Sequence, residues 1–380
     1  MSVIVPIKQR AVQVLLSGYF LCVAYWTWIW ATGNVNAYHN YYWSLVALGA
    51  FPITGGLFGI LLSRKWGFLS ALLGRAIFFI SVGLIMWGLG SLVFSYYNIV
   101  QNVEVPYPSL ADVGFILAPP FWIIGLFNLG KGIGAGYKMR TSRGKAIIAA
   151  IIMLSLSVSY YLLLSVARGG AFDFTESGIL KMTLDVLYPL FDAFLLTIIA
   201  LIYGLSYQAL EGRFKWPIDL LLIGFLAMYL ADFSFSYTTT QGTYYSSDWV
   251  DLLFLSAMFL LSAGVNALDI QGISSHARAE LLAFAPRANA AINNLVTEII
   301  RGQARVIGPV AWDEATKIRG LNIDVKNNSL SVEGDSKEVL GILMKRHEEL
   351  FGAASVEICK DAVRKELSQI PQDQLPDVLL

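Results

Sequence analysis

The sequence predicts an all-α polytopic membrane protein with eight transmembrane helices in two four-helix repeats, followed by a small cytoplasmic α+β C-terminal domain. The first observation is composition. Of 380 residues, 56% are hydrophobic and 14% are charged, whereas soluble domains carry about 25% charged residues. The second is a series of long apolar stretches that ends near residue 270. The third is an internal similarity between segments about 140 residues apart.

Eight stretches are long and apolar enough to span the hydrocarbon core, which needs about 20 such residues. The predicted spans cover residues 11–32, 41–63, 74–99, 110–130, 146–167, 180–207, 217–239 and 249–269. The first span ends in a cluster of Trp and Tyr residues, which is typical of a membrane interface. This span is also longer than the apolar region of a signal peptide, so we expect a first helix that is retained and not cleaved off.

The last two predicted spans and the polar hairpin between them resemble an earlier part of the chain. Residues 229–264 and 90–125 both have the pattern helix, hairpin, helix. The matched positions are Gly83 and Gly224, Ser91 and Asp232, Phe94-Ser95-Tyr96 and Phe235-Ser236-Tyr237, and Asp112 and Asp251. Because four spans per copy is an even number, both copies enter the membrane in the same direction, as in parallel repeats.

Basic residues predict the orientation of the spans. The segments before the first span and after the second, fourth and sixth are rich in Lys and Arg, whereas the opposite loops hold Arg168 and Lys181. The positive-inside rule therefore places both termini in the cytoplasm. The stretch from Gly130 to Lys145 has several glycines followed by basic residues and is predicted to be a flexible cytoplasmic linker.

Residues 271–380 are charged, and their sequence contains no further span. The pattern predicts helices over 275–302, 309–319, 336–351 and 355–367, with a small β-hairpin at 321–332. The predicted domains are 1–130 and 146–270 for the membrane repeats, 131–145 for the linker, 271–370 for the cytoplasmic α+β domain and 371–380 for a loose tail.

Carboxylates and aromatic residues gather at the predicted outer ends of the spans. A charge at membrane depth costs about 2.5–3.5 kcal/mol on insertion scales, so such groups normally face a cavity or a partner. Asp185, Tyr188 and Asp192 share one helix face, as do Asp232 and Ser236. These groups predict an outward-facing polar and aromatic pocket between the two halves. Its candidate ligand-binding residues are Asp192, Asp232, Tyr188, Ser236, Asp185, Asp112, Asp251 and Tyr237.

Some of these aspartates also fit a structural role. Asp112, Asp248 and Asp251 lie near predicted helix starts, where a carboxylate can accept hydrogen bonds from free backbone amides. Asp192 and Asp232 lie deeper in their spans, and the pocket hypothesis rests chiefly on them. Asp232 is the more informative of the two because its counterpart in the first copy, Ser91, carries no charge.

The same two aspartates raise an enzymatic alternative, because two carboxyl groups that share a proton can activate water. Intramembrane aspartyl proteases place the second Asp in Gly-x-Gly-Asp and carry a Pro-Ala-Leu element. This chain has Tyr-Leu-Ala-Asp at 229–232 and lacks the Pro-Ala-Leu element. We therefore do not expect an enzyme. The three histidines lie outside the predicted spans and no Cys/His spacing predicts zinc, so we expect no haem, other cofactor or metal.

Short motifs built on Tyr-Pro and Ala-Asp recur in the membrane part. They are Tyr-Pro-Ser-Leu-Ala-Asp-Val-Gly at 107–114, Tyr-Pro-Leu-Phe-Asp at 188–192, and Ala-Asp at 231–232 followed by Gly-Thr-Tyr at 242–244 and Asp251. Over about residues 10–270 the chain resembles a prokaryotic membrane sensor module that precedes diguanylate cyclase, phosphodiesterase or histidine kinase domains. The resemblance implies sensing and signal transduction across the cytoplasmic (inner) membrane of a prokaryote. The chain departs from such proteins because a small α+β domain takes the place of the catalytic domain.

These observations predict a membrane sensor without its own catalytic domain, in which an outer pocket is coupled to a cytoplasmic interaction domain. The alternatives are a small-solute or ion transporter that uses the midplane between the repeats, and a non-catalytic scaffold or subunit of a membrane complex. The expected partners are the lipid bilayer, an unknown small ligand or ion, a cytoplasmic protein bound through residues 271–370, and a second copy of the chain in a homodimer. The net charge of zero argues against a nucleic-acid partner.

Overall fold

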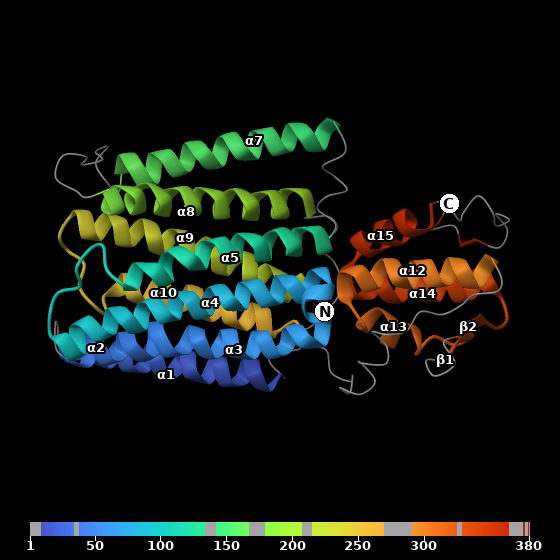
Figure 1. The fold of residues 1–380 in the computed structure, drawn as a ribbon, viewed down its shortest axis with the longest axis horizontal. Coiled ribbons are helices and arrows are strands. Elements are labelled where there is room, and N and C mark those ends of the chain that lie inside the picture. Colours follow the sequence, from blue (N-terminus) through green and yellow to red (C-terminus); the bar gives the residue numbers. More distant parts are fainter. Residues whose placement is uncertain are drawn as a thin grey trace.

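The computed structural model consists of a bundle of long helices and a smaller C-terminal domain that extends it along the long axis (Figure 1). The structure describes residues 9–33, 38–133, 142–166, 179–206, 215–269, 291–324, 329–364, 375–376 and 379. We refer to the end of the bundle that faces the C-terminal domain as the domain end, and to the opposite end as the hairpin end.

Eight helical segments of the described chain are long and apolar enough to cross a membrane, as the sequence predicts. Their bounds are α1 (Arg10–Thr32), α2 (Tyr38–Ser44) continued by π-helical Leu45–Ala50 and α3 (Phe51–Ser63), α4 (Leu72–Tyr96) continued by π-helical Tyr97–Gln101, α5 (Ala111–Gly132), α7 (Ser142–Ser159) continued by π-helical Tyr160–Val166, α8 (Ile179–Ser206), α9 (Lys215–Thr240) and α10 (Trp249–Asn266). Helices are expected here because a membrane-spanning segment must satisfy its backbone groups internally. The chain is therefore a multi-pass membrane protein by length and composition of its helices.

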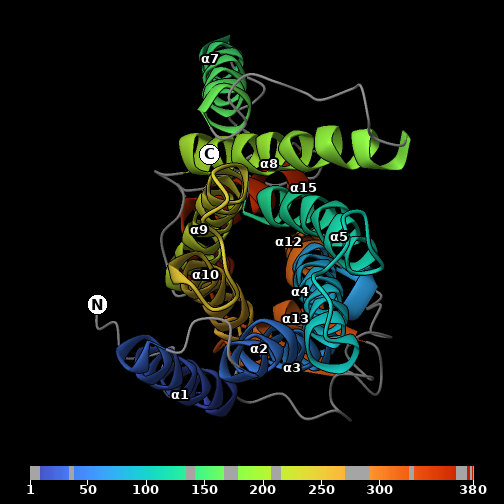
Figure 2. The same cartoon turned by 90° about the vertical axis from the view of Figure 1, so that its left-hand side faces the viewer.

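Seen along its axis, the bundle has a central group of helices and two peripheral ones (Figure 2). The continuous α2–α3 segment, α4, α5, α8, α9 and α10 surround the centre, and α1 and α7 lie outside this group. α4 packs along α5, α9 packs along α10, and α3 contacts both α4 and α10. α8 contacts both α5 and α9 on the other side. The interior therefore receives side chains from both predicted halves of the membrane part.

Glycines allow close packing between these helices. A methyl group added at Gly264 of α10 would lie 3.0 Å from the backbone nitrogen of Leu221 in α9. One added at Gly90 of α4 would lie 2.9 Å from the carbonyl oxygen of Ala111 in α5. Any larger side chain at these positions would push the helix pairs apart, as at other small-residue contacts between membrane helices.

In its described residues, the C-terminal domain packs four helices and a two-stranded hairpin around an apolar core. Its elements are α12 (Ala291–Ile307), α13 (Val310–Ala315), β1 (Leu321–Asp324), β2 (Ser329–Val332), α14 (Ser336–Phe351) and α15 (Ala353–Val363). The strands are antiparallel, and Leu321 lies opposite Val332. The bounds of α14 agree with the predicted 336–351. Asp335 caps this helix by accepting a hydrogen bond from the backbone nitrogen of Lys337, and Gly352 follows its last residue.

The first and last helices of this domain differ from prediction in their bounds. The sequence predicts a helix over 275–302, whereas α12 continues past Gly302 to Ile307. Gly302 does not end the helix because it serves close packing: a methyl group there would lie 2.6 Å from the side chain of Ala362 in α15. The last predicted helix runs to 367, and α15 ends at Val363. Predictions for residues 134–141, 270–290, 325–328 and 365–374 fall outside the described residues.

The short connection 64–70 between α3 and α4 ties the domain end of the bundle to α10. Trp66 is fully buried, and its indole nitrogen donates a 3.0 Å hydrogen bond to the carbonyl oxygen of Leu268. Beside it, Lys65 Nζ and Asp269 Oδ1 form a 2.6 Å ion pair. The residues that follow α10 are therefore held against this connection.

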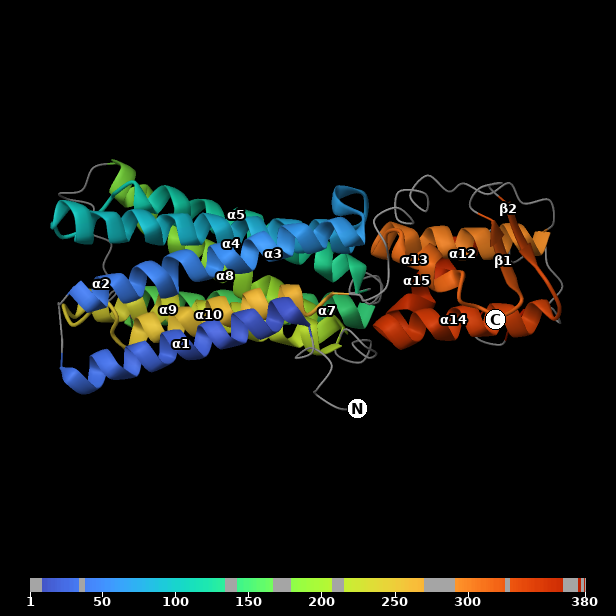
Figure 3. The ribbon, with the colours of Figure 1, turned by 90° about the horizontal axis from the view of Figure 1, so that it is seen from below.

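The same connection also contacts the C-terminal domain, as α4 does through α12, and Figure 3 shows α12 and α13 directly beyond the domain end. Gly67 and Gly308, which lies between α12 and α13, both have positive φ. A methyl group at Gly308 would lie 2.6 Å from the carbonyl oxygen of Trp66 and 3.2 Å from the backbone nitrogen of Gly67. The two backbones meet this closely because both residues lack a side chain.

Candidate functional site

A cavity of about 1080 Å³ lies among the central helices, lined by residues toward the hairpin end of the bundle. Its lining comes from the α2–α3 segment, α4, α5, α8, α9 and α10, together with the loops 102–109 and 244–246. The described residues of α1 and α7 do not contribute to the lining, in agreement with their peripheral position in Figure 2. The cavity is therefore shared by both predicted halves.

The cavity brings together six of the eight residues that the sequence proposes for a ligand site. These six are Asp112, Tyr188, Asp192, Asp232, Ser236 and Asp251. Tyr237 instead lies on the outside of α9, where it is 42% exposed and stacks on Phe233. It neighbours Ser236, and successive helical residues point about 100° apart, so only one of the two can face the cavity. The side chain of Asp185 lies outside the described part of the structure.

Asp192 of α8 and Asp232 of α9 are in direct contact, and their side chains hydrogen-bond to each other. An ionised carboxylate only accepts hydrogen bonds, so two carboxyl groups can bond in this way only if one of them keeps a proton. This carboxyl pair therefore shares at least one proton at a contact between two helices. Tyr229 of α9 lies close to Asp192, and its hydroxyl donates to Ser159 Oγ at 3.3 Å.

Asp112, in the first turn of α5, connects that helix to α8. Its Oδ2 accepts a 2.7 Å hydrogen bond from the backbone nitrogen of Ser109, and its Oδ1 accepts a 2.8 Å hydrogen bond from the hydroxyl of Tyr188. Tyr188 also lies close to Asp232. Tyr188 therefore stands between the Asp112 carboxylate and the carboxyl pair.

Asp251, in the first turn of α10, has a similar set of partners. Its Oδ2 accepts a 2.7 Å hydrogen bond from the backbone nitrogen of Ser247, and its Oδ1 accepts a 3.0 Å hydrogen bond from the hydroxyl of Tyr244. Ser44 Oγ of α2 lies 3.5 Å from the same carboxylate. Asp251, like Asp112, thus binds backbone at a helix start and also lines the cavity, so the two roles weighed from the sequence coexist.

Asp248 has the capping role alone, as its place before the helix predicts. Its Oδ1 accepts hydrogen bonds from the backbone nitrogens of Val250 at 2.8 Å and Asp251 at 3.2 Å. Burial raises the pKa of Asp248, although its backbone hydrogen bonds act in the opposite direction. The pKa of the neighbouring Tyr244 is held well above its ordinary value. Burial is the largest cause, and the negative charges of Asp251 and Asp248 raise the pKa further. Tyr244 therefore stays a neutral hydrogen-bond donor.

Aromatic side chains form a continuous wall of the cavity across four helices and the hairpin. The ring of Trp87 lies 5.6 Å from that of Phe115 and 5.5 Å from that of Phe254. Phe235 continues the row, at 6.2 Å from Phe254 and 4.8 Å from Tyr244. All five residues line the cavity. The wall presents ring faces and edges to any molecule bound beside the carboxyl pair.

The floor of the cavity is apolar and tightly packed. Trp122 of α5 lines the cavity, is 1% exposed, and contacts Phe225 of α9 edge to face with ring centroids 5.7 Å apart. Gly83 makes room for the Trp122 ring on α4. From this floor to the domain end, fully buried residues such as Leu126 and Leu221 fill the space between the helices. The described cavity thus ends at Trp122 and does not continue along the bundle.

Several cavity residues are not among those proposed from the sequence. Ser44, Trp87 and Ser95 line the cavity from α2 and α4. Ser95 is 1% exposed, and its Oγ has no hydrogen-bond partner in the described structure. The internal similarity contains the signal for Ser95, since it matches Ser236. Ser44 carries no such signal, because the matched positions of the two repeats begin only at Gly83.

The chemistry available here is that of one proton-sharing carboxyl pair, two further carboxylates, neutral tyrosine hydroxyls and aromatic rings. Among the described residues, no group of three or more His, Cys, Asp or Glu side chains is placed to hold a metal ion. The arrangement fits the recognition of a small molecule with at least one polar group and an apolar part.

Comparisons of this chain with protein-family models, with curated proteins and with solved structures give no match. The resemblance to signalling modules, which rests on short motifs, therefore stays a prediction. The function must be argued from the cavity and from its connection to the C-terminal domain.

Proposed function

We propose that this protein is a membrane sensor that binds a small ligand in the cavity and transmits the change to its C-terminal domain. The observation that carries the proposal is a cavity built from both halves of the bundle and closed by the Trp122 floor. A ligand that touches α5, α8, α9 and α10 together can favour one arrangement of these helices over another. A closed floor suits sensing better than transport, which needs access from both ends.

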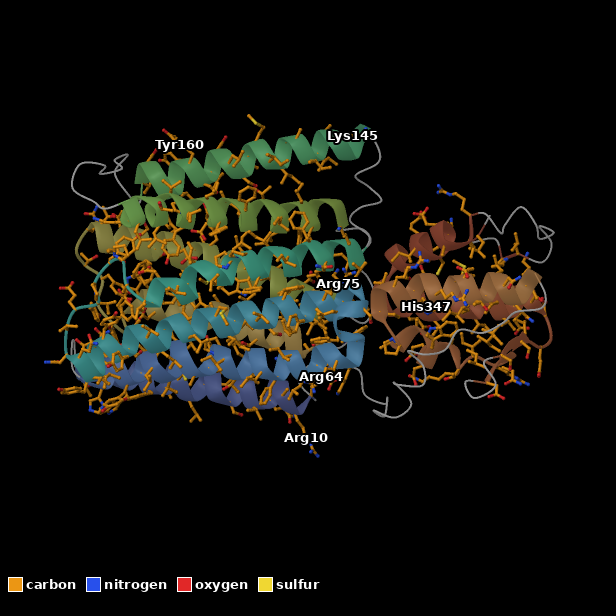
Figure 4. All side chains as sticks on the ribbon, in the orientation of Figure 1. Arg10, Arg64, Arg75, Lys145, Tyr160 and His347 are labelled. Carbon is orange, nitrogen blue, oxygen red and sulfur yellow. The ribbon has the colours of Figure 1, made fainter. Side chains whose placement is uncertain are left out.

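The proposed topology places the cavity on the outer side of a prokaryotic inner membrane and the C-terminal domain in the cytoplasm. Figure 4 shows Arg64, Arg75 and Lys145 at the domain end of the bundle and Tyr160 toward the hairpin end. The excess of Lys and Arg on cytoplasmic loops supports this orientation. The C-terminal domain would then meet its protein partner in the cytoplasm.

The internal duplication belongs to the same proposal. Ser91 and Asp232 both line the cavity, as do Asp112 and Asp251. In addition, Asp112 and Asp251 each accept a hydrogen bond from a tyrosine hydroxyl and from the backbone nitrogen of a preceding serine. These parallels support two copies that face each other across the cavity. The two copies differ at the position of Asp232. The second copy has there the carboxyl group that pairs with Asp192, whereas the first copy has Ser91.

The proposed route to the C-terminal domain runs through α10. Asp251 lies in the cavity near the start of this helix, and Leu268 and Asp269, just after its end, contact Trp66 and Lys65. A small shift of α10 on ligand binding would move the 64–70 connection, against which Gly308 rests. Packed helices tend to move as rigid bodies between discrete arrangements, so the shift would reach the C-terminal domain.

A thiol label in the cavity tests this proposal without knowledge of the ligand. In Ser236→Cys the new thiol lines the cavity. In the matched control Tyr237→Cys the thiol lies on the outer face of α9, away from the cavity. The native Cys22 and Cys359 are buried. After reaction with a bulky methanethiosulfonate reagent, we expect hydrogen exchange at residues 64–70 and 306–312 to change several-fold in Ser236→Cys alone.

Two results would contradict the sensor proposal. If the label at position 236 leaves exchange at the junction unchanged while both variants stay folded, the cavity is not coupled to the C-terminal domain. If the label instead blocks solute uptake into proteoliposomes, the transporter alternative is correct. The scaffold alternative would require that filling the cavity has no effect in either assay.

The carboxyl pair favours one second candidate, peptide hydrolysis within the membrane. Two carboxyl groups that share a proton can activate a water molecule for attack on a peptide bond. Incubation of the protein in proteoliposomes with transmembrane reporter peptides tests this candidate, with Asp232→Asn as the control. The sensor proposal expects no cleavage, and cleavage that disappears in Asp232→Asn would replace it with an enzyme.

A further inference from the structure

The lining of the cavity is strongly acidic. Among the described residues, the lining contains the carboxyl groups of Glu104, Asp112, Asp192, Asp232 and Asp251, and a single ammonium group, that of Lys181. Asp112 and Asp251 each bind a backbone amide and a tyrosine hydroxyl, whereas Asp192 and Asp232 bind each other. A cavity of one sign of charge with apolar walls raises the local concentration of ligands of the opposite sign.

The aromatic wall has the same preference. Eleven of the described lining residues are Phe, Tyr or Trp. The electron-rich face of an aromatic ring attracts a cation, by about 2 kcal/mol or more where water is excluded. Asp232 lies one helical turn before Phe235, which belongs to this wall. A cation beside the carboxyl pair would therefore lie close to an aromatic ring.

The size and the polar groups of the cavity indicate an organic cation. About 1080 Å³ is at the upper end of small-molecule sites. The described residues contain no cluster of three or more ligands suited to a metal ion. A fully buried hydroxyl, Ser95 Oγ, lines the cavity without a hydrogen-bond partner in the described structure, so a ligand with a second polar group has a place to bind.

We infer that the cavity selects an organic ammonium cation with an apolar or aromatic body, and that Asp192 and Asp232 together form its counter-ion. This inference rests on the proposed function and names the ligand class of the same cavity. The ammonium group donates hydrogen bonds to both carboxylates, and the aromatic wall covers the apolar body.

Binding of this kind displaces the proton that the carboxyl pair shares. The hydrogen bond between Asp192 and Asp232 breaks, the ammonium donates to both oxygens in its place, and the proton leaves to the solvent. One positive charge enters and one leaves, so the net charge of the site is unchanged. The titratable groups that face the pair are Tyr188 on α8, Tyr229 on α9 and Asp112 on α5, with Lys181, Tyr244 and Asp251 further along the lining.

Three probes with one aromatic body and different charges test the inference. Phenethylammonium is a cation, 2-phenylethanol is neutral and phenylacetate is an anion. Each is titrated by calorimetry into the full chain in lipid nanodiscs, with empty nanodiscs subtracted. We expect phenethylammonium to bind at least about tenfold more tightly than the alcohol, a difference of about 1.4 kcal/mol, and phenylacetate to bind more weakly than either.

Variants of the carboxyl pair assign the charge preference to these residues. Asp192→Asn and Asp232→Asn should weaken phenethylammonium binding at least about tenfold and leave the thermal midpoint and the binding of 2-phenylethanol nearly unchanged. The control is Asp219→Asn, which removes a carboxylate from the domain end of α9, away from the cavity lining. It should leave all three affinities unchanged.

Titrations in buffers with different heats of ionisation measure the displaced proton. We expect about one proton released per phenethylammonium bound near pH 7, and about none in Asp192→Asn. Equal or tighter binding of phenylacetate or 2-phenylethanol would overturn the cation assignment while leaving a ligand-binding sensor intact. Failure of all three probes to bind would overturn the assignment as well. The proposed function would then be decided by the label experiment at Ser236, which needs no ligand.

Discussion

His347 makes the stability of the C-terminal domain depend on pH. It is 1% exposed, and burial lowers its pKa from 6.5 to about 4. Because the folded pKa lies below the unfolded one, the unfolded state binds the additional proton as the pH falls. Stability is therefore complete above pH 6.5 and decreases toward pH 4, by about 3 kcal/mol over that interval.

The measurement is hydrogen exchange of the α14 amides in the full chain between pH 7 and pH 4, corrected for the intrinsic exchange rate at each pH. In His347→Leu most of the pH dependence should disappear above pH 4.5. Below that pH the protonation of Glu314 lowers the stability of the domain as well. Although burial acts to raise the pKa of Glu314, hydrogen bonds and charges from Lys317 and Arg346 lower it overall. A wild-type domain equally protected at pH 7 and pH 4 would contradict the role of His347.

Single residues of the site were predictable where a carboxylate lies deep in a predicted span. Asp192 and Asp232 could be selected because a carboxylate far from a helix end needs a partner, and the structure places the two in contact. Tyr237 could not be separated from Ser236, since an amphipathic tyrosine suits both a pocket and a membrane interface. That the two aspartates bind each other depends on how α8 and α9 pack, which the sequence does not state.

At the scale of elements, the start of α10 depends on one capping residue. Asp248 accepts hydrogen bonds from two backbone nitrogens of the first turn and is 2% exposed. Asp248→Ala leaves these amides without an acceptor and should lower stability by about 1 kcal/mol. Thermal unfolding in detergent micelles measures the change. Asp248→Asn keeps a capping oxygen and should lose much less, and an equal loss in both variants would show that charge rather than capping matters.

The membrane helices and the C-terminal hairpin were the predictable elements. A spanning helix can be recognised from the length of its apolar stretch. The bounds of α14 can be recognised locally, because Asp335 caps its first turn and Gly352 follows its last residue. The end of α12 was not predictable in the same way. Gly302 has the appearance of a helix end, yet it lies within the helix because Ala362 of α15 packs against it. A glycine required by a distant contact looks in the sequence like one required by a turn.

At the scale of the whole molecule, the backbone of the 64–70 connection meets the turn after α12, and α4 also contacts α12. The 64–70 connection lies between the end of α10 and the turn after α12, and its Trp66 is bonded to Leu268. The residues that line the cavity lie toward the hairpin end of the bundle, and the C-terminal domain lies beyond the opposite end of the bundle, as Figure 1 shows. The sequence predicts a pocket between the two halves, but it shows neither the full lining of the cavity nor the junction. Both bring together residues far apart in the chain, such as Ser44 with Asp251 and Trp66 with Leu268. Any signal between them depends on how firmly the junction holds.

Gly308→Ala tests the junction directly. The residue has φ +62°, and its new methyl group would lie 2.6 Å from the carbonyl oxygen of Trp66, so the C-terminal domain must move away from the bundle. Gly334→Ala is the matched control, because Gly334 has φ +89° but no atom within 4 Å of such a methyl group. Both variants carry the backbone strain of about 1 kcal/mol. Gly308→Ala alone should raise hydrogen exchange at residues 64–70 several-fold and abolish the response to a label at Ser236→Cys. If Gly334→Ala has the same effect, backbone strain within the domain explains the loss; if neither variant has it, the signal does not pass through this contact.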